Sequence, residues 1–292
     1  MQRQTTLFIG NDINNLIPGN SWKDLIKELK EFCRVGGDAI NDKNKPFPLL
    51  YEEIYLRSLA IGNTTEKAIK EFIGGKFLET KPGQIHEQIR GLNVKNIITT
   101  NYDFALEGSV PDKNYGIIDE RAYSVFRHFV VDKKNIWHAH GDCRASSSIN
   151  LGYEHYSGQL QQLRNYVTTG THYKSNVLPT LPLIRRLEQG PFRIHSWADL
   201  FFRDDIYIFG FALDFVESDI WWLLTYRARQ ILANQIAPGN KIFYFIPSEY
   251  VAKSLPKLDL LSVNTVEIID RYSGKDKAQY YQFVIRHIKT KL

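Results

Sequence analysis

The last third of the chain alternates apolar, β-prone runs with segments of helical periodicity, and this alternation restricts the fold more than any other feature. It predicts strands at residues 206–209, 241–246 and 266–269, followed by helices at residues 219–234, 250–261 and 278–288. Pro256 is expected to interrupt the second of these helices. Parallel strands need crossover connections, usually helices, and these cover both faces of the sheet. We therefore predict an α/β fold: a Rossmann-like parallel sheet with helices on both faces.

The first hundred residues add two strands with a helical segment between them. Residues 5–9 predict a buried strand that ends at Gly10, and residues 96–100 predict the next strand. The helical patterns between them lie at residues 22–32, with Ser21 as N-cap, and at residues 49–59, 66–73 and 85–92. Gly74 and Gly75 are expected to stop the third of these helices. We expect one domain over residues 1–292, with a small helical insertion at about 21–90.

The middle of the chain carries weaker signals. Residues 123–131 are β-prone, residues 136–139 and 147–151 predict short strands, and Leu160, Leu163 and Val167 have helical spacing. Residues 168–191 contain Gly, Ser, Asn and three Pro residues, a composition typical of a segment that is partly loop.

Charge and cysteine content argue against several classes of protein. The net charge of +5 is compatible with an anionic ligand such as a dinucleotide and equally with an ordinary basic surface, and the absence of a dense Lys/Arg block argues against direct nucleic-acid binding. The two cysteines, Cys33 and Cys143, form no CxxC pair, so no metal is expected. No apolar run approaches the ~18 residues of a membrane span, and nothing resembles a signal peptide. We expect a cytoplasmic protein without membrane contact.

Glycines and polar residues follow four of the predicted strands. These segments are Gly10-Asn11-Asp12, Thr99-Thr100-Asn101-Tyr102-Asp103, His138-Ala139-His140-Gly141 and Gly210-Phe211-Ala212-Leu213. Ligands bind beyond the carboxyl ends of the strands in open parallel sheets. The sequence therefore predicts one ligand site to which all four segments contribute.

Each segment also has a purely structural interpretation. Gly10 and Gly210 are also compatible with ordinary turns. Asn101 and Asp103 are also suited to cap a helix that begins near Phe104. His138 and His140 are predicted to alternate along a strand and to face opposite sides, which would leave one of them as a structural histidine.

Taken together, the segments resemble the sirtuin family, also called the silent information regulator 2-like family. Thr99 to Asp103 resembles its Thr-x-Asn-x-Asp motif, and His140-Gly141 resembles its His-Gly motif. Leu151-Gly152-Tyr153 and the stretch from Gly210 to Asp219 are most similar to the prokaryotic NAD-hydrolysing branch, whose members act in antiphage defence. The resemblance covers roughly residues 7–269.

The resemblance implies cleavage of NAD to nicotinamide and ADP-ribose, with NAD as substrate and no metal. Asn101 would hold the ribose and the attacking water, and His140 would be the general base. The residues that would contact the nucleotide are Gly10, Asn11, Asp12, Thr100, Asp103, Gly210, Phe211 and Leu213. A regulatory or sensor protein, or a homo-oligomer, is the expected partner, because uncontrolled NAD cleavage would kill the cell.

Other functions remain open at this point. The same site would suit transfer or cyclisation of ADP-ribose, or a sensor that binds NAD or ADP-ribose without cleaving it. The four-cysteine zinc module of the deacetylating sirtuins is absent, which argues against a protein deacetylase. The first loop also departs from the family, because Gly10-Asn11-Asp12 stands where the family has Gly-Ala-Gly.

Overall fold

The computed structural model describes residues 3–17, 22–36, 40–41, 45–118, 120–170, 181–189, 192–237, 239–272 and 276–292. Within these residues, seven strands form one sheet in the order β3-β4-β2-β1-β5-β6-β7. The strands are β1 (Thr5–Ile9), β2 (Asn96–Thr99), β3 (His128–Val131), β4 (Lys134–His138), β5 (Asp205–Phe209), β6 (Ile242–Pro247) and β7 (Val266–Arg271). All neighbours are parallel except β3 and β4. The predicted α/β class is confirmed.

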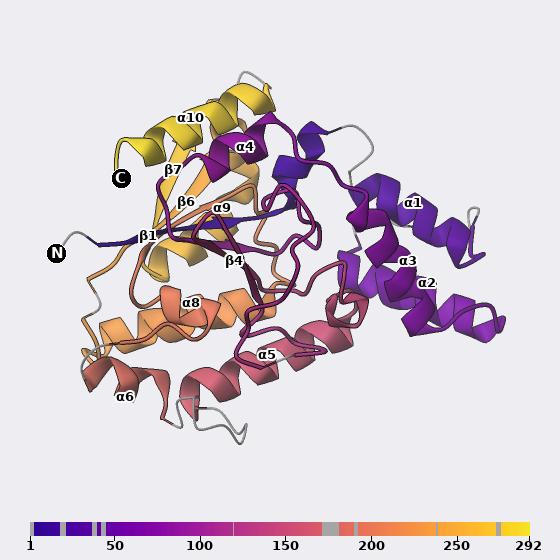
Figure 1. The fold of residues 1–292 in the computed structure, drawn as a ribbon, viewed down its shortest axis with the longest axis horizontal. Helices are drawn as coiled ribbons and strands as arrows, with labels where there is room; N and C mark the ends of the chain where they lie inside the picture. Colours follow the sequence, from indigo (N-terminus) through magenta and orange to yellow (C-terminus); the bar gives the residue numbers. More distant parts are fainter. Residues whose placement is uncertain are drawn as a thin grey trace.

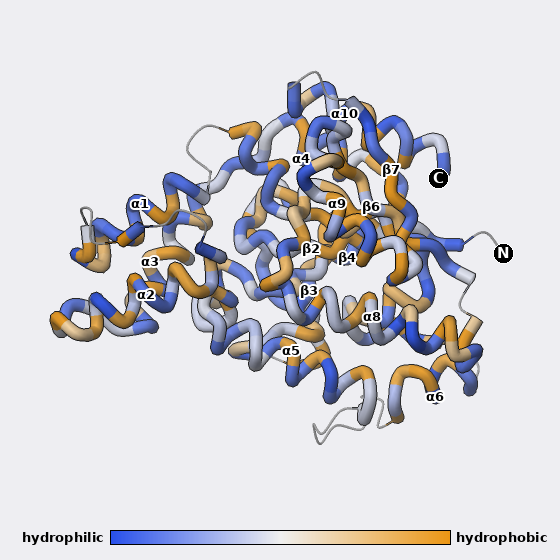
Figure 2. Tube along the Cα trace, turned by 180° about the vertical axis from the view of Figure 1, so that it is seen from behind, coloured by the Kyte–Doolittle hydropathy of each residue, from blue (hydrophilic) through white to orange (hydrophobic). Residues whose placement is uncertain are grey.

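The central strand β1 shows why both faces of the sheet are covered. Leu7, Phe8 and Ile9 are fully buried, and successive side chains of a strand point to opposite faces. Phe8 belongs to one hydrophobic cluster, whereas Leu7 and Ile9 belong to another on the opposite side. Apolar residues recur along the central strands, and the outer helices mix apolar with polar residues (Figure 2).

Helices cover the two faces unequally. One face carries α4 (Gln84–Arg90) and α10 (Lys277–Lys289), which lie side by side in Figure 1. The other face carries α5 (Tyr153–Thr168), α6 (Leu183–Glu188), α7 (Trp197–Leu200), α8 (Ser218–Leu232) and α9 (Ser248–Val263). Among the described residues, no helix is both long and apolar enough to cross a membrane.

A group of three helices projects from one end of the sheet (Figure 1). These are α1 (Trp22–Phe32), α2 (Phe47–Ala60) and α3 (Glu66–Leu78). Their buried residues, among them Leu29, Tyr51 and Ile73, form a separate hydrophobic cluster. The group lies within residues 21–90, the range predicted as an insertion, whereas α4 in the same range packs against α10 beside the sheet.

Two predicted helix breaks are wrong. Helix α3 continues through Gly74 and Gly75, and α9 continues through Pro256. A Cβ atom on Gly74 would lie 2.8 Å from the backbone oxygen of Cys143. The glycine therefore allows α3 to approach the backbone of its neighbour closely and does not end the helix.

Three other local predictions also fail. Residues 147–151 form no strand, because the short 3-10 helix η2 (Ser146–Ser148) occupies their start. Only His128–Val131 of the β-prone segment pairs in the sheet, and residues 101–109 form turns with no helix at Phe104. The proposed cap Ser21 and residues 171–180 lie outside the described residues.

Candidate active site

The carboxyl ends of β1, β2, β4 and β5 open into one cavity of about 400 Å³. Its lining comprises Asn11, Asp12, Asn15, Trp22, Lys45, Pro46, Phe47, Pro48, Phe77, Thr100, Asn101, Tyr102, His140, Tyr156, Gly210, Phe211, Ala212, Asp214, Val216 and Glu217. The sheet continues from β1 with β2 on one side and with β5 on the other, so the order in which strands are added reverses at β1. The crevice beyond such a reversal is where open α/β sheets bind ligands.

Most of the sequence-predicted site residues lie on this cavity, and three lie behind it. Asn11, Asp12, Thr100, Asn101, His140, Gly210 and Phe211 line it. Gly10, Asp103 and Leu213 do not line it. Leu213 is fully buried in the hydrophobic cluster beneath the loop after β5, so its role there is packing.

Asn101 presents a buried amide to the cavity. The residue is 3% exposed, and neither its side-chain nitrogen nor its oxygen has a hydrogen-bond partner among the described residues. Its backbone is fixed, because its N–H donates to Thr99 Oγ1 at 3.0 Å. A buried polar group without a partner is costly, and sites that bind polar ligands are where such groups occur. The geometry thus suits an amide that bonds to a ligand.

His140 lies between two carboxylates. Its Nε2 is 2.9 Å from Asp219 Oδ2, and its Nδ1 is 3.8 Å from Glu217 Oε2. Asp219 is fully buried in the first turn of α8, where the helix dipole favours a negative charge. If the Nε2–H donates to Asp219, Nδ1 is the ring nitrogen that is able to take up a proton.

His140 and Glu217 both have shifted pKa values in this environment. Burial lowers the pKa of His140, but the Asp219 and Glu217 carboxylates outweigh burial and raise it above its ordinary value. Burial raises the pKa of Glu217 to about 7, His140 opposes this rise, and Asp219 adds to it. Sequence analysis did not select these acids, although both lie in the stretch from Gly210 to Asp219.

His138 is in a different environment from His140 and does not line the cavity. Its Nε2 is 2.8 Å from Glu107 Oε1 and its Nδ1 is 2.9 Å from the backbone oxygen of Asn101. Residues two apart on a regular strand share a face, so strand periodicity alone would not separate the two histidines. They diverge because β4 ends at His138 and the chain turns. His138 thus supports the backbone of Asn101.

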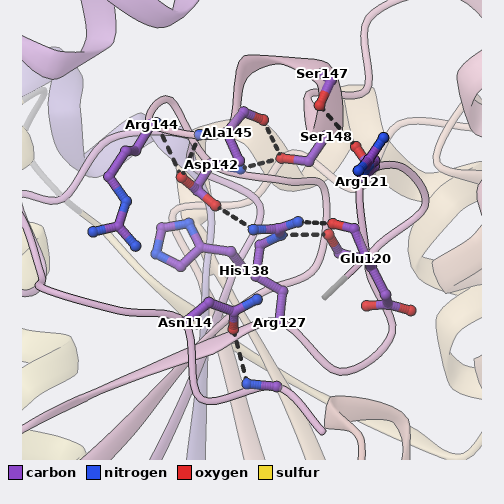
Figure 3. A network of polar contacts seen from close by, with 12 residues as sticks. Asn114, Glu120, Arg121, Arg127, His138, Asp142, Arg144, Ala145, Ser147 and Ser148 are labelled. Atoms are coloured by element: carbon purple, nitrogen blue, oxygen red, sulfur yellow. Dashed lines mark hydrogen bonds and ion pairs between the residues drawn. The ribbon is translucent and has the colours of Figure 1, made fainter. Parts of the chain in front are cut away.

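The turn after His140 is fixed by a glycine and a buried charge network (Figure 3). Gly141 has φ +90°, and a Cβ atom there would lie 2.1 Å from the backbone oxygen of Ser148. Asp142 then accepts hydrogen bonds from Arg127 at 2.8 Å and from two backbone N–H groups. This arrangement explains physically why glycine must follow the histidine in this motif.

The loop after β1 is held from two directions. Asp103 accepts a 2.7 Å hydrogen bond from Asn14, so it positions the 3-10 helix η1 (Asn11–Leu16) from behind the cavity. The Asp12 carboxylate accepts 2.6 Å hydrogen bonds from Lys277 and Tyr281 of α10. A Cβ atom on Gly10 would lie 2.5 Å from Gly210 O, so this position requires glycine.

Aromatic residues from the helical group complete the cavity. Trp22, Phe47 and Phe77 line it beside Tyr102, with the Trp22 and Phe47 rings 4.5 Å apart. Tyr156 of α5 also lines the cavity, and its ring makes a T-shaped contact with the His140 ring, with the ring centroids 5.3 Å apart. No sequence motif marked these residues, because they reach the site only through tertiary packing.

Among the described residues, one group has the spacing to hold a metal ion. It consists of His140, Glu217 and Asp219, each of which offers one ligand atom within 4.8 Å of the other two. Two of these ligand atoms, His140 Nε2 and Asp219 Oδ2, lie 2.9 Å apart and already form a hydrogen bond with each other. We therefore expect elemental analysis to find no stoichiometric metal, and EDTA to leave turnover unchanged. A bound metal that is removed together with activity would contradict this.

The Leu151-Gly152-Tyr153 segment depends on a neutral histidine. His155 Nδ1 accepts hydrogen bonds from the backbone N–H groups of Leu151 and Gly152, at 3.2 and 2.9 Å. Burial, assisted by Lys70, lowers the pKa of His155 to about 3. The pKa of His155 is thus lower in the folded protein than the value of about 6.5 in the unfolded chain. The stability that comes with the neutral ring is complete above pH 6.5, and it is lost as the pH falls from 6.5 toward 3.

We therefore expect His155 to lower the free energy of unfolding by at most about 1.4 kcal/mol for each pH unit below 6.5. His155→Gln keeps a hydrogen-bond acceptor but does not titrate, so its thermal midpoint should fall less steeply between pH 6.5 and 4. Parallel pH profiles for the two proteins would show that His155 titrates normally.

Comparison with protein families places a known domain over the centre of this site. Residues 95–178 match the model of the SIR2-like domain. The matched segment carries Asn101 and His140 and runs from β2 into α5. Curated proteins give no match to the chain. SIR2-like domains use NAD, so the match fits an NAD-related function. Residues 95–178 of the protein are therefore similar to a SIR2-like domain.

Proposed function

We propose that the protein is an NAD glycohydrolase that converts NAD and water to nicotinamide and ADP-ribose. The observation that carries the proposal is the pairing of a buried, unpartnered Asn101 amide with His140 in one cavity. This cavity lies at the ligand-binding edge of the sheet, and both residues belong to the segment that matches a SIR2-like domain.

The reaction replaces the bond between ribose and nicotinamide. The C–N bond breaks, its electron pair leaves with the nicotinamide nitrogen, and a water oxygen bonds to the anomeric carbon. The Asn101 amide positions the ribose and the water, a form of orientation that lowers the barrier by several kcal/mol. His140 Nδ1 takes the proton from water, while Asp219 holds the ring through Nε2. The positive nicotinamide nearby favours the neutral ring before this step.

The direct test is to incubate the purified protein with NAD and to separate nicotinamide and ADP-ribose by chromatography. Equal amounts of the two products support hydrolysis. Cyclic ADP-ribose, or ADP-ribose attached to protein, would instead support cyclisation or transfer. Tight NAD binding without any product, under all activating conditions tried, would favour the sensor function.

We further propose that the enzyme acts in the cytoplasm as a gated effector of antiphage defence. An ungated NADase would exhaust the cell's NAD, so a second protein or self-assembly is needed to control it. The helical group α1–α3 is the surface we favour for this contact, because its Trp22, Phe47 and Phe77 line the cavity. Mass in solution and turnover should be measured alone and with proteins encoded by neighbouring genes. A fully active monomer would contradict gating.

A further inference from the structure

Glu217 is a cavity residue to which the reaction above assigns no role. It precedes α8 and lines the cavity together with Asn101 and His140. Its side chain is 16% exposed, and its Oε2, 3.8 Å from His140 Nδ1, has no hydrogen-bond partner among the described residues. A buried carboxylate oxygen without a hydrogen bond is costly, so it requires a functional or structural reason.

The charge around His140 does not balance. With the His140 ring neutral, as the proposed proton transfer requires, the ionised carboxylates of Glu217 and Asp219 leave a net charge of −2. This excess lies at the end of the cavity that holds Asn101 and His140. The only positive charge of NAD is on its nicotinamide ring, next to the bond that breaks.

Among the acids near the cavity, Glu217 is the one placed to meet that charge. Asp219 is fully buried against His140 and does not line the cavity. Asp12 is occupied by Lys277 and Tyr281 of α10. Asp214 lines the cavity, but it is exposed to solvent, where screening weakens its field.

We propose that Glu217 is a catalytic residue whose carboxylate stabilises the ribosyl cation that forms as nicotinamide leaves. As the C–N bond breaks, positive charge moves from the nicotinamide ring to the ribose, and neutral nicotinamide departs. Glycosidases stabilise the same kind of oxocarbenium charge with carboxylates. Glu217 acts by charge alone and forms no covalent bond. The inference rests on the proposed NAD cleavage.

The first experiment measures turnover by Glu217→Gln, which preserves shape and removes the charge. We expect kcat to fall by about 100-fold, the usual effect of removing one preorganised electrostatic group. Glu217→Asp should retain part of the activity. The matched control is Glu154→Gln, the same change at an exposed position in the first turn of α5, outside the cavity. Glu217→Gln with wild-type kcat would overturn the proposal.

The second experiment tests the charge without turnover. NADH lacks the positive charge of the nicotinamide ring, so it serves as the neutral probe. In an Asn101→Ala background, which slows cleavage, adding Glu217→Gln should weaken NAD⁺ binding by about tenfold and leave NADH binding nearly unchanged. Equal effects on the two nucleotides, or none, would overturn the proposal.

The two experiments also separate this inference from the proposed function. A wild-type protein that binds NAD but never cleaves it would end the NADase proposal. The difference between NAD⁺ and NADH would then still report whether Glu217 faces the nicotinamide. An active wild-type enzyme with an insensitive Glu217→Gln variant would leave the NADase proposal standing and remove only the role of Glu217.

Discussion

Replacing Asn101 by alanine is expected to lower NAD turnover by roughly 100-fold or more, without loss of stability. The amide has no hydrogen-bond partner among the described residues, so its removal breaks no side-chain hydrogen bond there. The substitution also removes a buried polar group that lacks a partner. Such an unsatisfied group costs the folded state about 1–3 kcal/mol. The thermal midpoint should therefore stay the same or rise while activity falls. Turnover by chromatography and thermal unfolding of the same preparation check both parts.

Asn240 provides the matched control. It is equally buried, but its amide donates hydrogen bonds to Phe201 O at 3.0 Å and Asp204 O at 2.6 Å. Asn240→Ala should therefore lose stability and retain turnover per folded molecule. If Asn101→Ala instead unfolds at lower temperature and keeps its activity, Asn101 is a structural residue.

His140 needs a more careful substitution than alanine. Alanine would leave Asp219 buried without its partner, and the resulting instability would obscure any catalytic effect. His140→Gln retains an amide donor for Asp219 but has no basic nitrogen, so turnover should fall between about 100-fold and 10,000-fold. Wild-type turnover in this variant would rule out His140 as the general base.

His138→Ala is expected to destabilise the protein by about 3–5 kcal/mol, because it leaves Glu107 buried without a partner. Both side chains are fully buried, and the Glu107 carboxylate outweighs burial in raising the pKa of His138. For a chain of this size, the loss corresponds to a fall of roughly 10 °C in the thermal midpoint. Thermal unfolding at neutral pH measures it.

A double variant distinguishes the ion pair from general packing. Replacing both His138 and Glu107 by leucine removes the two charges together, so part of the lost stability should return. If the double variant loses as much stability as the single variants His138→Leu and Glu107→Leu lose together, the two side chains contribute no coupling energy.

The ends of the central strands could be predicted from local sequence. Apolar runs followed by Gly10, Asn101 or Gly210 indicate strands that stop at a polar edge, and the parallel topology brings such edges together. His140 belongs with them, although strand periodicity gave no basis for separating it from His138. That separation depends on where β4 ends, which is decided by the positive φ of Gly141 and the Asp142 network.

Residues that reach the cavity from other elements could not be predicted in this way. Glu217 and Asp219 follow His140 by more than 70 residues along the chain and contact it only through tertiary packing, in which α8 packs against α5. Trp22 and Phe77 carry ordinary helical periodicity and enter the site through the packing of α1–α3. Gly74 and Pro256 misled prediction because tertiary packing outweighs the intrinsic helix preference of a single residue.

The position of β1 also determines when the site is able to form during synthesis. Its partners in the sheet begin at Asn96 and Asp205, and its loop is held by Lys277, 265 residues beyond Asp12. An emerging chain therefore has no complete cavity until α8 and α10 have left the ribosome, and ribosomes add about 5–20 residues per second. Under the proposed NAD cleavage, this order of assembly means that unfinished chains lack a complete site for turnover.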